Sequence, residues 1–215
     1  MKSFEKAFLT GCDKNTEWML PWFLNNYKKY NNTPIIFANF GVSEKTLKYV
    51  KTNFDEILDI TTATEQGWFK KPLSMLKSTA HNTVWIDTDC EVLGDISKIF
   101  SYIEPEKLAM VQDKPWTKRR GEKWYNSGVV GFQGKPSILL DWRDNVIRNP
   151  QIGDQEVLHS MLGPITQLKY ISDVPNEYNW LRLQIENDGQ DSPKKKIMHW
   201  TGPKGKDRIR SMMNA

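Results

Sequence analysis

The sequence predicts an α/β protein with a mostly parallel central sheet flanked by helices and a mixed C-terminal half. Two observations predict this fold class. Through residues 1–90, short apolar runs alternate with helical segments, which is the pattern of a parallel sheet wrapped by helices. Beyond residue 90 the alternation becomes irregular, which indicates a second half built from mixed strands and helices.

Four apolar runs in the first half are typical of strands. They cover residues 7–10, 34–40, 56–60 and 83–86, and the first run ends at Gly11. Helices are expected between them, over residues 17–30, 44–51 and 72–80. Thr16 and Ser43 precede the first two helices, where a hydroxyl side chain can accept a free backbone N–H as an N-cap.

The second half is predicted element by element from shorter signals. Residues 95–100, 136–149 and 154–162 are expected to be helices, the last ended by Gly163 and Pro164. Strands are expected over residues 108–112, 129–132, 167–171 and 196–200. Residues 187–193 are rich in Asn, Asp, Gly and Pro, which indicates a turn or a mobile loop.

The composition favours one soluble globular domain. The chain has 215 residues, of which 39% are hydrophobic, and a net charge of +4. Much of the excess positive charge lies within residues 194–210, so no nucleic-acid partner is expected. Residues 203–215 are expected to form a solvated basic tail, with peripheral contact to an anionic membrane as the alternative.

Several function and location classes are excluded by what the sequence lacks. It has neither a Gly-x-Gly-x-x-Gly motif nor a P-loop, so nicotinamide enzymes and P-loop kinases are poor interpretations. The apolar stretch at the start is too short for a signal peptide, and no window is long enough to span a bilayer. A cytoplasmic protein is therefore expected, with Cys12 and Cys90 as reduced packing residues.

The most informative motif is Asp87, Thr88 and Asp89, which directly follows the apolar run 83–86. The strand delivers two carboxylates close together at its carboxyl end, where open α/β sheets bind their ligands. Two such carboxylates repel each other unless a cation lies between them, and a hard divalent metal is the simple solution. The alternative is that Asp87 is a helix cap or a surface residue.

Three further motifs carry polar residues at the ends of apolar runs. Asn126, Ser127 and Gly128 precede the expected strand 129–132, either as a ligand-contacting segment or as an ordinary turn. Asp154 and Gln155 begin a helix, and the plainest interpretation of Asp154 is an N-cap.

The last of these motifs begins with His199, at the end of a late strand. It is followed by Gly202, Lys204 and Lys206. A lone His is more often a hydrogen-bonded structural residue than a metal ligand. One imidazole together with two carboxylates nevertheless suits Mn²⁺ better than Ca²⁺. The two lysines could neutralise a diphosphate.

These motifs, in this order, resemble the nucleotide-sugar glycosyltransferases of the GT-A fold. They are most similar to the retaining glycosyltransferase family 8, which includes glycogenin-like and lipopolysaccharide galactosyltransferase-like enzymes. The resemblance runs from Phe8 to about Lys206. It implies a single GT-A catalytic domain over residues 1–215. Its parts are a nucleotide-binding half (about 1–100), a sugar and acceptor half (about 101–202) and the basic tail (203–215).

The resemblance also implies roles for the residues of each motif. Asp87, Asp89 and His199 correspond to the metal ligands, with Mn²⁺ as the expected ion and Mg²⁺ as an alternative. Asp154 and Gln155 correspond to the pair beside the reacting carbon. Contacts to the donor are expected from the remaining motif residues and from the end of the first strand: Thr10, Gly11, Asp13, Lys71, Thr88, Asn126, Ser127, Gly128, Gly202, Lys204 and Lys206.

The function implied is the metal-dependent transfer of a hexose from a nucleoside-diphosphate sugar, with UDP-sugars favoured, to a hydroxyl acceptor with retention. The acceptor would be a saccharide, a lipid-linked saccharide or a protein. Asp113 could bind a sugar hydroxyl or be a plain loop carboxylate. Two alternatives stay open: a metal-dependent nucleotidyltransferase, and a non-catalytic protein of the same fold that binds nucleotide sugars.

Overall fold

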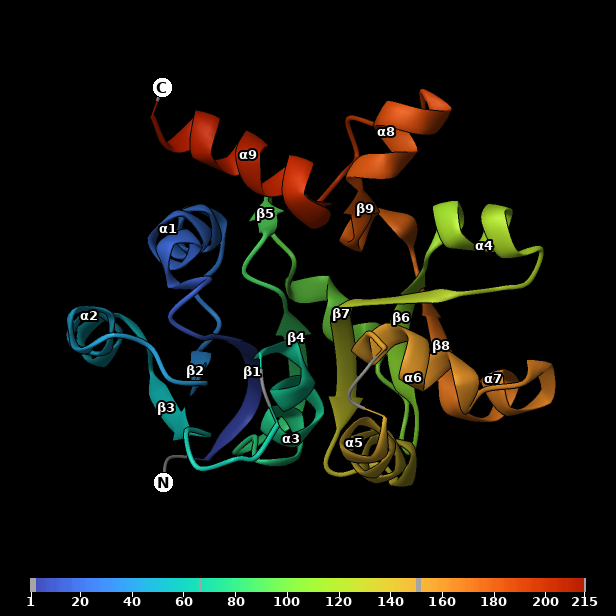
Figure 1. Ribbon diagram of the computed structural model, residues 1–215, viewed down its shortest axis with the longest axis horizontal. Coiled ribbons are helices and arrows are strands. Elements are labelled where there is room, and N and C mark those ends of the chain that lie inside the picture. Colours follow the sequence, from blue (N-terminus) through green and yellow to red (C-terminus); the bar gives the residue numbers. More distant parts are fainter. Residues whose placement is uncertain (1–2, 66, 150–151, 215) are drawn as a thin grey trace.

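A computed structural model describes residues 3–65, 67–149 and 152–214. Its centre is a seven-stranded sheet in the order β3-β2-β1-β4-β7-β6-β8 (Figure 1). The strands are β1 (Phe4–Cys12), β2 (Ile35–Asn39), β3 (Glu56–Asp59), β4 (Ala80–Ile86), β6 (Leu108–Gln112), β7 (Tyr125–Gln133) and β8 (Ile171–Val174). The chain is therefore α/β, as the alternating pattern predicts.

The first half of the chain forms the parallel part of this sheet. Strands β1 to β4 alternate with helices α1 (Leu20–Tyr30), α2 (Glu44–Asn53) and α3 (Lys71–Leu76). β1 pairs in parallel with both β2 and β4, and β2 pairs in parallel with β3. Parallel pairing is expected here, because a helix between two strands returns the chain to the same end of the sheet. The predicted β-α-β alternation is confirmed.

The second half adds the antiparallel strand β7 to the sheet. β7 lies between β4 and β6 and runs opposite to both, with Ile86 paired to Val129. Because β4 ends at Ile86, this register brings the start of β7 beside Asp87, and the Asp87 backbone N–H donates to the Gly128 carbonyl at 2.9 Å. The polar residues of β7 thus meet the end of β4.

A second, three-stranded sheet completes this edge. Its order is β5 (Cys90–Val92), β10 (Ile197–His199) and β9 (Trp180–Leu181). β10 pairs antiparallel with β5, and His199 lies opposite Cys90. This pairing brings His199, which is distant in sequence, close to Asp89, the residue before Cys90.

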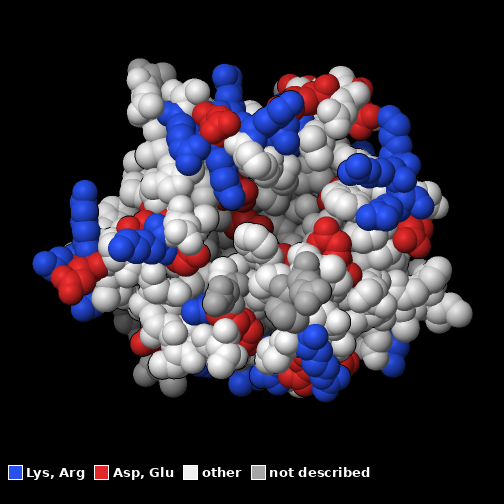
Figure 2. Space-filling view, in the orientation of Figure 1, with Lys and Arg blue, Asp and Glu red and all other residues white. Residues whose placement is uncertain are grey.

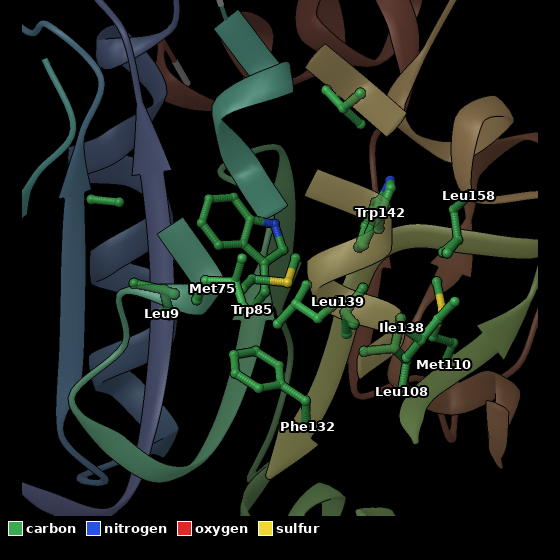
Figure 3. Packing of buried hydrophobic residues seen from close by; sticks show 14 of the residues in the cluster. Leu9, Met75, Trp85, Leu108, Met110, Phe132, Ile138, Leu139, Trp142 and Leu158 are labelled. Carbon is green, nitrogen blue, oxygen red and sulfur yellow. The ribbon is translucent and has the colours of Figure 1, made fainter. Parts of the chain in front are cut away.

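The core has two parts, one on each face of the large sheet. Helices α3, α5 (Ser137–Arg148) and α6 (Asp154–Ser160) cover one face, and α1, α2 and the 3₁₀ segment η3 (Ser97–Tyr102) cover the other. Figure 3 shows the first part, where Met75, Trp85 and Leu139 lie together and Trp142 packs nearby. Trp85 and Trp142 are almost fully buried. The burial of such large apolar groups anchors the strands that carry the polar residues.

The remaining elements are short or lie near the edges of the sheets. They are the 3₁₀ segments η1 (Glu17–Met19), η2 (Gly67–Lys70) and η4 (Asn176–Tyr178) and the helices α4 (Lys114–Arg120), α7 (Pro164–Tyr170), α8 (Arg182–Asp188) and α9 (Gly202–Met213). Within the described residues, no helix combines the length and apolar character needed to cross a bilayer.

Several predicted boundaries are wrong. The expected strand over 167–171 is mostly helix α7, because Pro164 starts a helical turn there and β8 begins only at Ile171. The expected helix over 72–80 ends at Leu76, and Ala80 already belongs to β4. Ser43 is confirmed as an N-cap that accepts the Thr46 N–H.

Other differences concern caps and the chain end. Thr16 makes no capping bond; its hydroxyl donates to Asp13, and the segment after it begins as the 3₁₀ turn η1. Residues 126–128 lie inside β7 rather than in a turn before it. The expected solvated tail is instead helix α9, which buries Ile209 and extends toward α1 (Figure 1).

Candidate active site

A cleft of about 590 Å³ lies at the carboxyl end of the parallel strands. Figure 2 shows the hollow, with acidic atoms deep inside and Lys and Arg side chains around its upper rim. The cleft brings together most of the residues that the sequence analysis selects: Gly11, Asp13, Lys71, Asp87, Thr88, Asp89, Asn126, Ser127, Gly128, Asp154, Gln155, His199, Gly202 and Lys206. These residues come from positions far apart in the chain, so only the fold assembles them.

Two predicted donor contacts do not line the cleft. Thr10 lies within β1 and is fully buried, and it is not among the residues that line the cleft. Lys204 is exposed on the first turn of α9, and Lys206 of the same helix lines the cleft instead. Neither residue is therefore among those that the cleft brings together.

Asp87 is held by two donors where β4 ends. The Trp85 indole N–H donates to its Oδ1 at 2.6 Å, and Lys71 Nζ lies 3.1 Å from the same oxygen. Burial raises the pKa of Asp87, and Asp89 and Asp154 add to that effect, whereas Lys71 opposes it. Asp87 is consequently a fixed carboxylate that depends on the Lys71 cation.

Lys71 is the buried cation of the site. Its Nζ lies 3.0 Å from Asp154 Oδ2 and donates to the carbonyl and hydroxyl oxygens of Ser127 at 3.2 and 3.3 Å. Burial alone would lower the pKa of Lys71, but the carboxylates of Asp154 and Asp87 outweigh it and raise that pKa. The lysine is therefore charged at neutral pH. Its ammonium group binds both the carboxylate that follows β4 and the carboxylate in the first turn of α6.

Asp89 and His199 face each other directly. His199 Nε2 lies 3.2 Å from Asp89 Oδ1, and the imidazole is almost fully buried. Burial opposes the charge on both groups, but each stabilises the other's ionised form. The pKa of His199 is therefore raised by Asp89, and the pKa of Asp89 is lowered by His199. In the protein without an ion, the contact favours the imidazolium–carboxylate form of the two groups.

Asn179 fixes the orientation of the imidazole. Its Nδ2 donates to Asn126 Oδ1 at 2.8 Å, so its Oδ1 is left to accept from His199 Nδ1 at 3.0 Å. The other ring nitrogen, Nε2, is thereby directed at Asp89. A ligating histidine characteristically donates its second N–H in this way, so the arrangement fits a metal ligand.

The same network continues to the other side of the cleft. Asn126 Nδ2 donates to Gln155 Oε1 and to Asp113 Oδ2, both at 3.0 Å. Gln155 Nε2 donates to the same Asp113 oxygen at 3.1 Å, and its Oε1 also accepts the Ser127 N–H. An unbroken chain of hydrogen bonds thus joins His199 to Gln155. Asp113 is a buried member of it rather than a plain loop carboxylate.

The metal-binding potential centres on Asp89 and His199. Among the described residues, the ligand atoms of Asp89, Cys90 and His199 lie within 4.8 Å of one another. Cys90 is a weak candidate, because burial raises the pKa of its thiol well above the usual value and keeps it protonated. Asp87, the third expected ligand, is paired with Lys71. To bind a metal ion, its carboxylate would have to contact the ion and the lysine at the same time. The oxygen and imidazole donors suit a divalent ion such as Mn²⁺.

Asp154 is not the N-cap of its helix. Gly153 occupies the cap position, and Asp154 lies in the first turn of α6, where its carboxylate meets Lys71. The alternative interpretation of this residue as a simple cap is therefore wrong. A negative charge in the first helical turn is also favoured by the helix dipole.

Sequence reasoning missed several residues of the site. Asn179, which orients His199, precedes β9 in a segment without any regular pattern, so no sequence signal marks it. Trp18, Trp68, Trp116 and Arg210 were also missed, and these four residues line the cleft. The high tryptophan content, nine residues in all, is compatible with aromatic side chains at a binding site, but it does not indicate which of them line the cleft.

The fold is that of the GT-A glycosyltransferases. The structure matches glycosyltransferase GlyE of Streptococcus pneumoniae TIGR4 with a TM-score of 0.71 and 16% identity, covering 92% of this chain and 55% of that one. It matches galactosyltransferase LgtC, in complex with donor and acceptor sugar analogues, with a TM-score of 0.64 and 13% identity, covering 97% and 95%. The bifunctional glycosyltransferase WbbM matches with a TM-score of 0.64 and 13% identity, covering 94% and 46%. No protein-family model and no curated protein sequence matches the chain.

Proposed function

We propose that this protein is a metal-dependent glycosyltransferase. It would move a hexose from a nucleoside-diphosphate sugar, with UDP-sugars favoured, to a hydroxyl of a saccharide, lipid-linked saccharide or protein, with retention of configuration. The observation that carries the proposal is the convergence, in one cleft of a GT-A fold, of the Asp89–His199 pair with Asp87, Lys71 and the Asp154–Gln155 pair. The chain spans about half the length of GlyE. The proposed activity therefore concerns the residues of this chain and is not taken over from the whole of GlyE.

Asp89, His199 and Asp87 would hold the divalent ion, with Mn²⁺ preferred and Mg²⁺ as the alternative. When bound, such an ion supplies charge neutralisation and Lewis acidity at the diphosphate of the donor. The residues present fit it, because Asn179 directs His199 Nε2 toward Asp89 and because the donor set is one nitrogen and carboxylate oxygens.

The nucleotide and its diphosphate would lie along the first-half side of the cleft. Gly11 and Asp13 lie where β1 ends and would contact the nucleoside. Lys206 projects from α9 into the cleft, and Gly202 begins that helix. A lysine there would stabilise the negative charge that grows on the departing diphosphate.

The hexose would lie over the amide and carboxylate cluster. Asp154 is oriented by Lys71, whose Nζ lies 3.0 Å from its Oδ2, so its carboxylate would face the positive charge that develops on the sugar ring. Gln155 and Asn126 are locked by hydrogen bonds to each other and to Asp113. Side chains already fixed in this way lose little entropy on binding, which favours precise positioning of the reacting carbon.

The proposal is tested by incubating the protein and Mn²⁺ with a panel of nucleotide sugars and measuring the free nucleotide released. Release of nucleoside diphosphate from one donor supports it. Release of pyrophosphate would favour the nucleotidyltransferase alternative, and Mn²⁺-dependent binding of UDP without turnover would favour the non-catalytic alternative.

The metal assignment is tested with Asp89→Asn, which should lower turnover by at least about 100-fold while leaving the fold intact. Asp141→Asn is the matched control, because Asp141 is exposed on α5 and far in sequence from the motif. An Asp89→Asn protein as active as the parent would remove the metal assignment.

A further inference from the structure

Helix α4 lies beside the cleft and is strongly basic. Its seven residues include Lys114, Lys118, Arg119 and Arg120 and no acidic residue. Figure 2 shows basic side chains gathered at the side of the molecule where Figure 1 places α4. Lys118 is already paired with Asp188 of α8. Among the described residues, neither Arg119 nor Arg120 forms an ion pair with a carboxylate.

The two arginines are held on an aromatic support. The Arg120 guanidinium lies 4.8 Å from the centre of the Trp116 ring, and that of Arg119 lies 5.6 Å from it. Trp116 in turn stacks on the buried Trp124 at 5.1 Å. A guanidinium above an indole ring keeps its N–H edge free for a planar anion, which an ammonium on a flexible stem does less well.

This support lies one helical turn from the centre of the site. Asp113 caps α4 by accepting the Trp116 N–H at 3.0 Å, and the other Asp113 oxygen accepts from Asn126 and Gln155. Trp116 itself lines the cleft. It belongs to α4, which Figure 1 places on the opposite side of β7 from β1, where the nucleoside is proposed to bind. A saccharide entering there would place one hydroxyl near Gln155 and another part against the arginines.

From this arrangement we propose that the acceptor is an anionic saccharide whose carboxylate or phosphate is bound by Arg119 and Arg120 beside Trp116. The inference rests on the proposed function and names the acceptor class of that site. The centre of the cleft carries Asp87, Asp113 and Asp154, which would repel an anion, so the negative group belongs at the α4 rim while the neutral hydroxyl enters the centre.

Binding of three matched probes tests the inference in the presence of UDP and Mn²⁺. The probes are p-nitrophenyl β-glucoside, the corresponding β-glucuronide and the corresponding 6-phosphate, and their dissociation constants are measured by ligand-observed NMR titration. The anionic probes should bind about tenfold more tightly than the glucoside. The better of the two identifies the anion as carboxylate or phosphate. The preference should shrink as salt is raised, because rim charges are screened.

Variants of α4 separate charge recognition from general effects. The double variant Arg119→Gln/Arg120→Gln should abolish the preference, and Arg119→Lys/Arg120→Lys should keep part of it. Arg208→Gln, on the exposed side of α9, is the matched control and should retain the preference in full. Circular dichroism checks that each variant is folded.

Equal binding of the three probes, no binding of the anionic ones, or a preference that survives Arg119→Gln/Arg120→Gln overturns the inference. Sedimentation with phosphatidylglycerol-containing vesicles is measured in parallel. If the glutamine variant loses vesicle binding and no probe is preferred, α4 contacts anionic lipid instead and the inference is wrong. Nucleotide release without acceptor reports separately on the proposed function, so the two failures are distinguishable.

Discussion

Gly128 and His199 pack so closely that a Cβ atom at position 128 would lie 2.2 Å from His199 Cε1 and 2.6 Å from Nδ1. These residues belong to β7 of the large sheet and β10 of the small one. The absence of a side chain at position 128 is therefore what lets the imidazole lie against β7, in reach of both Asn179 and Asp89. The close approach, rather than an unusual backbone dihedral angle, explains the glycine.

The first prediction is that Gly128→Ala displaces His199. The added methyl group overlaps buried ring atoms, so the free energy of unfolding should fall by about 1–3 kcal/mol. Mn²⁺ affinity, measured by electron paramagnetic resonance titration, should fall at least about tenfold. Gly94→Ala is the control, since its nearest neighbours are Lys196 side-chain atoms at 3.5 and 3.6 Å. Unchanged Mn²⁺ affinity in Gly128→Ala would contradict a ligand role for His199.

The second prediction concerns Asn179, which is fully buried between His199 and Asn126. Asn179→Ala leaves the Nδ1–H of His199 without its partner, and Asn126 Oδ1 keeps only the Gly128 N–H. An unsatisfied buried group costs about 1–3 kcal/mol. Mn²⁺ affinity should fall about 10–100-fold, the usual effect of losing the partner of a ligating histidine. Asn176→Ala is a matched control, because no hydrogen bond involves the Asn176 side chain in the described part of the chain. Equal effects of the two variants would show that Asn179 is not a positioning residue.

The parallel half of the fold could be predicted because its signals are local. Each apolar run there is bounded by a helical segment, and caps such as Ser43 mark helix starts directly. The second half could be predicted only in part. β6, α5, α6 and β10 lie where the sequence predicts them. β5 and β9 were not predicted, because they are only two or three residues long and exist through pairing with β10. Propensity carries little information for such short strands.

The site was predictable where a motif follows a strand, and not where packing alone selects a residue. Asp87, Asp89 and His199 are visible as polar residues at the ends of apolar runs. Asn179 and Trp116 are not, because their roles depend on partners 20 or more residues away or on the cap at Asp113. The segment 203–215 differs from the expected solvated tail because helix α9 buries Gly205 and Ile209 despite its otherwise polar sequence.

The third prediction is that Lys71→Met destabilises the fold by removing a buried charge rather than by loss of packing. The variant leaves the buried carboxylates of Asp87 and Asp154 without their shared cation, which typically costs about 3–5 kcal/mol. Adding Asp154→Asn should recover part of that loss. Lys70→Met is the control, because Lys70 is buried too but its ammonium donates to the Phe40 carbonyl rather than to a carboxylate, so the variant should cost about 1 kcal/mol. Urea denaturation measures all three variants, and similar losses for Lys70 and Lys71 would refute the role given to Lys71.

The fourth prediction is that α9 is part of the folded core. Ile209 is fully buried, so Ile209→Ala should lower the free energy of unfolding by about 2–5 kcal/mol. Met213 lies at the end of the same helix with 44% of its surface exposed, and Met213→Ala should change stability by no more than about 0.5 kcal/mol. Denaturant titration compares the two. A small loss in both variants would restore the description of this segment as a solvated tail.

The fifth prediction is that pH acts in opposite directions on metal binding and on the stability of the metal-free protein. The pKa of His199 is raised above 6.5 and that of Asp89 is lowered below 3.8, so the imidazolium–carboxylate pair stabilises the fold fully between these two values. That contribution is lost as pH rises through the raised pKa of His199 or falls through the lowered pKa of Asp89.

A metal ion needs the neutral imidazole, so Mn²⁺ affinity should instead increase as pH rises from 6 to 8, with a proton released on binding. Calorimetry in buffers of different ionisation enthalpy measures the released proton, and His199→Gln should abolish both the release and the alkaline loss of stability. Mn²⁺ binding that is independent of pH and releases no proton would show that His199 Nε2 is not a ligand.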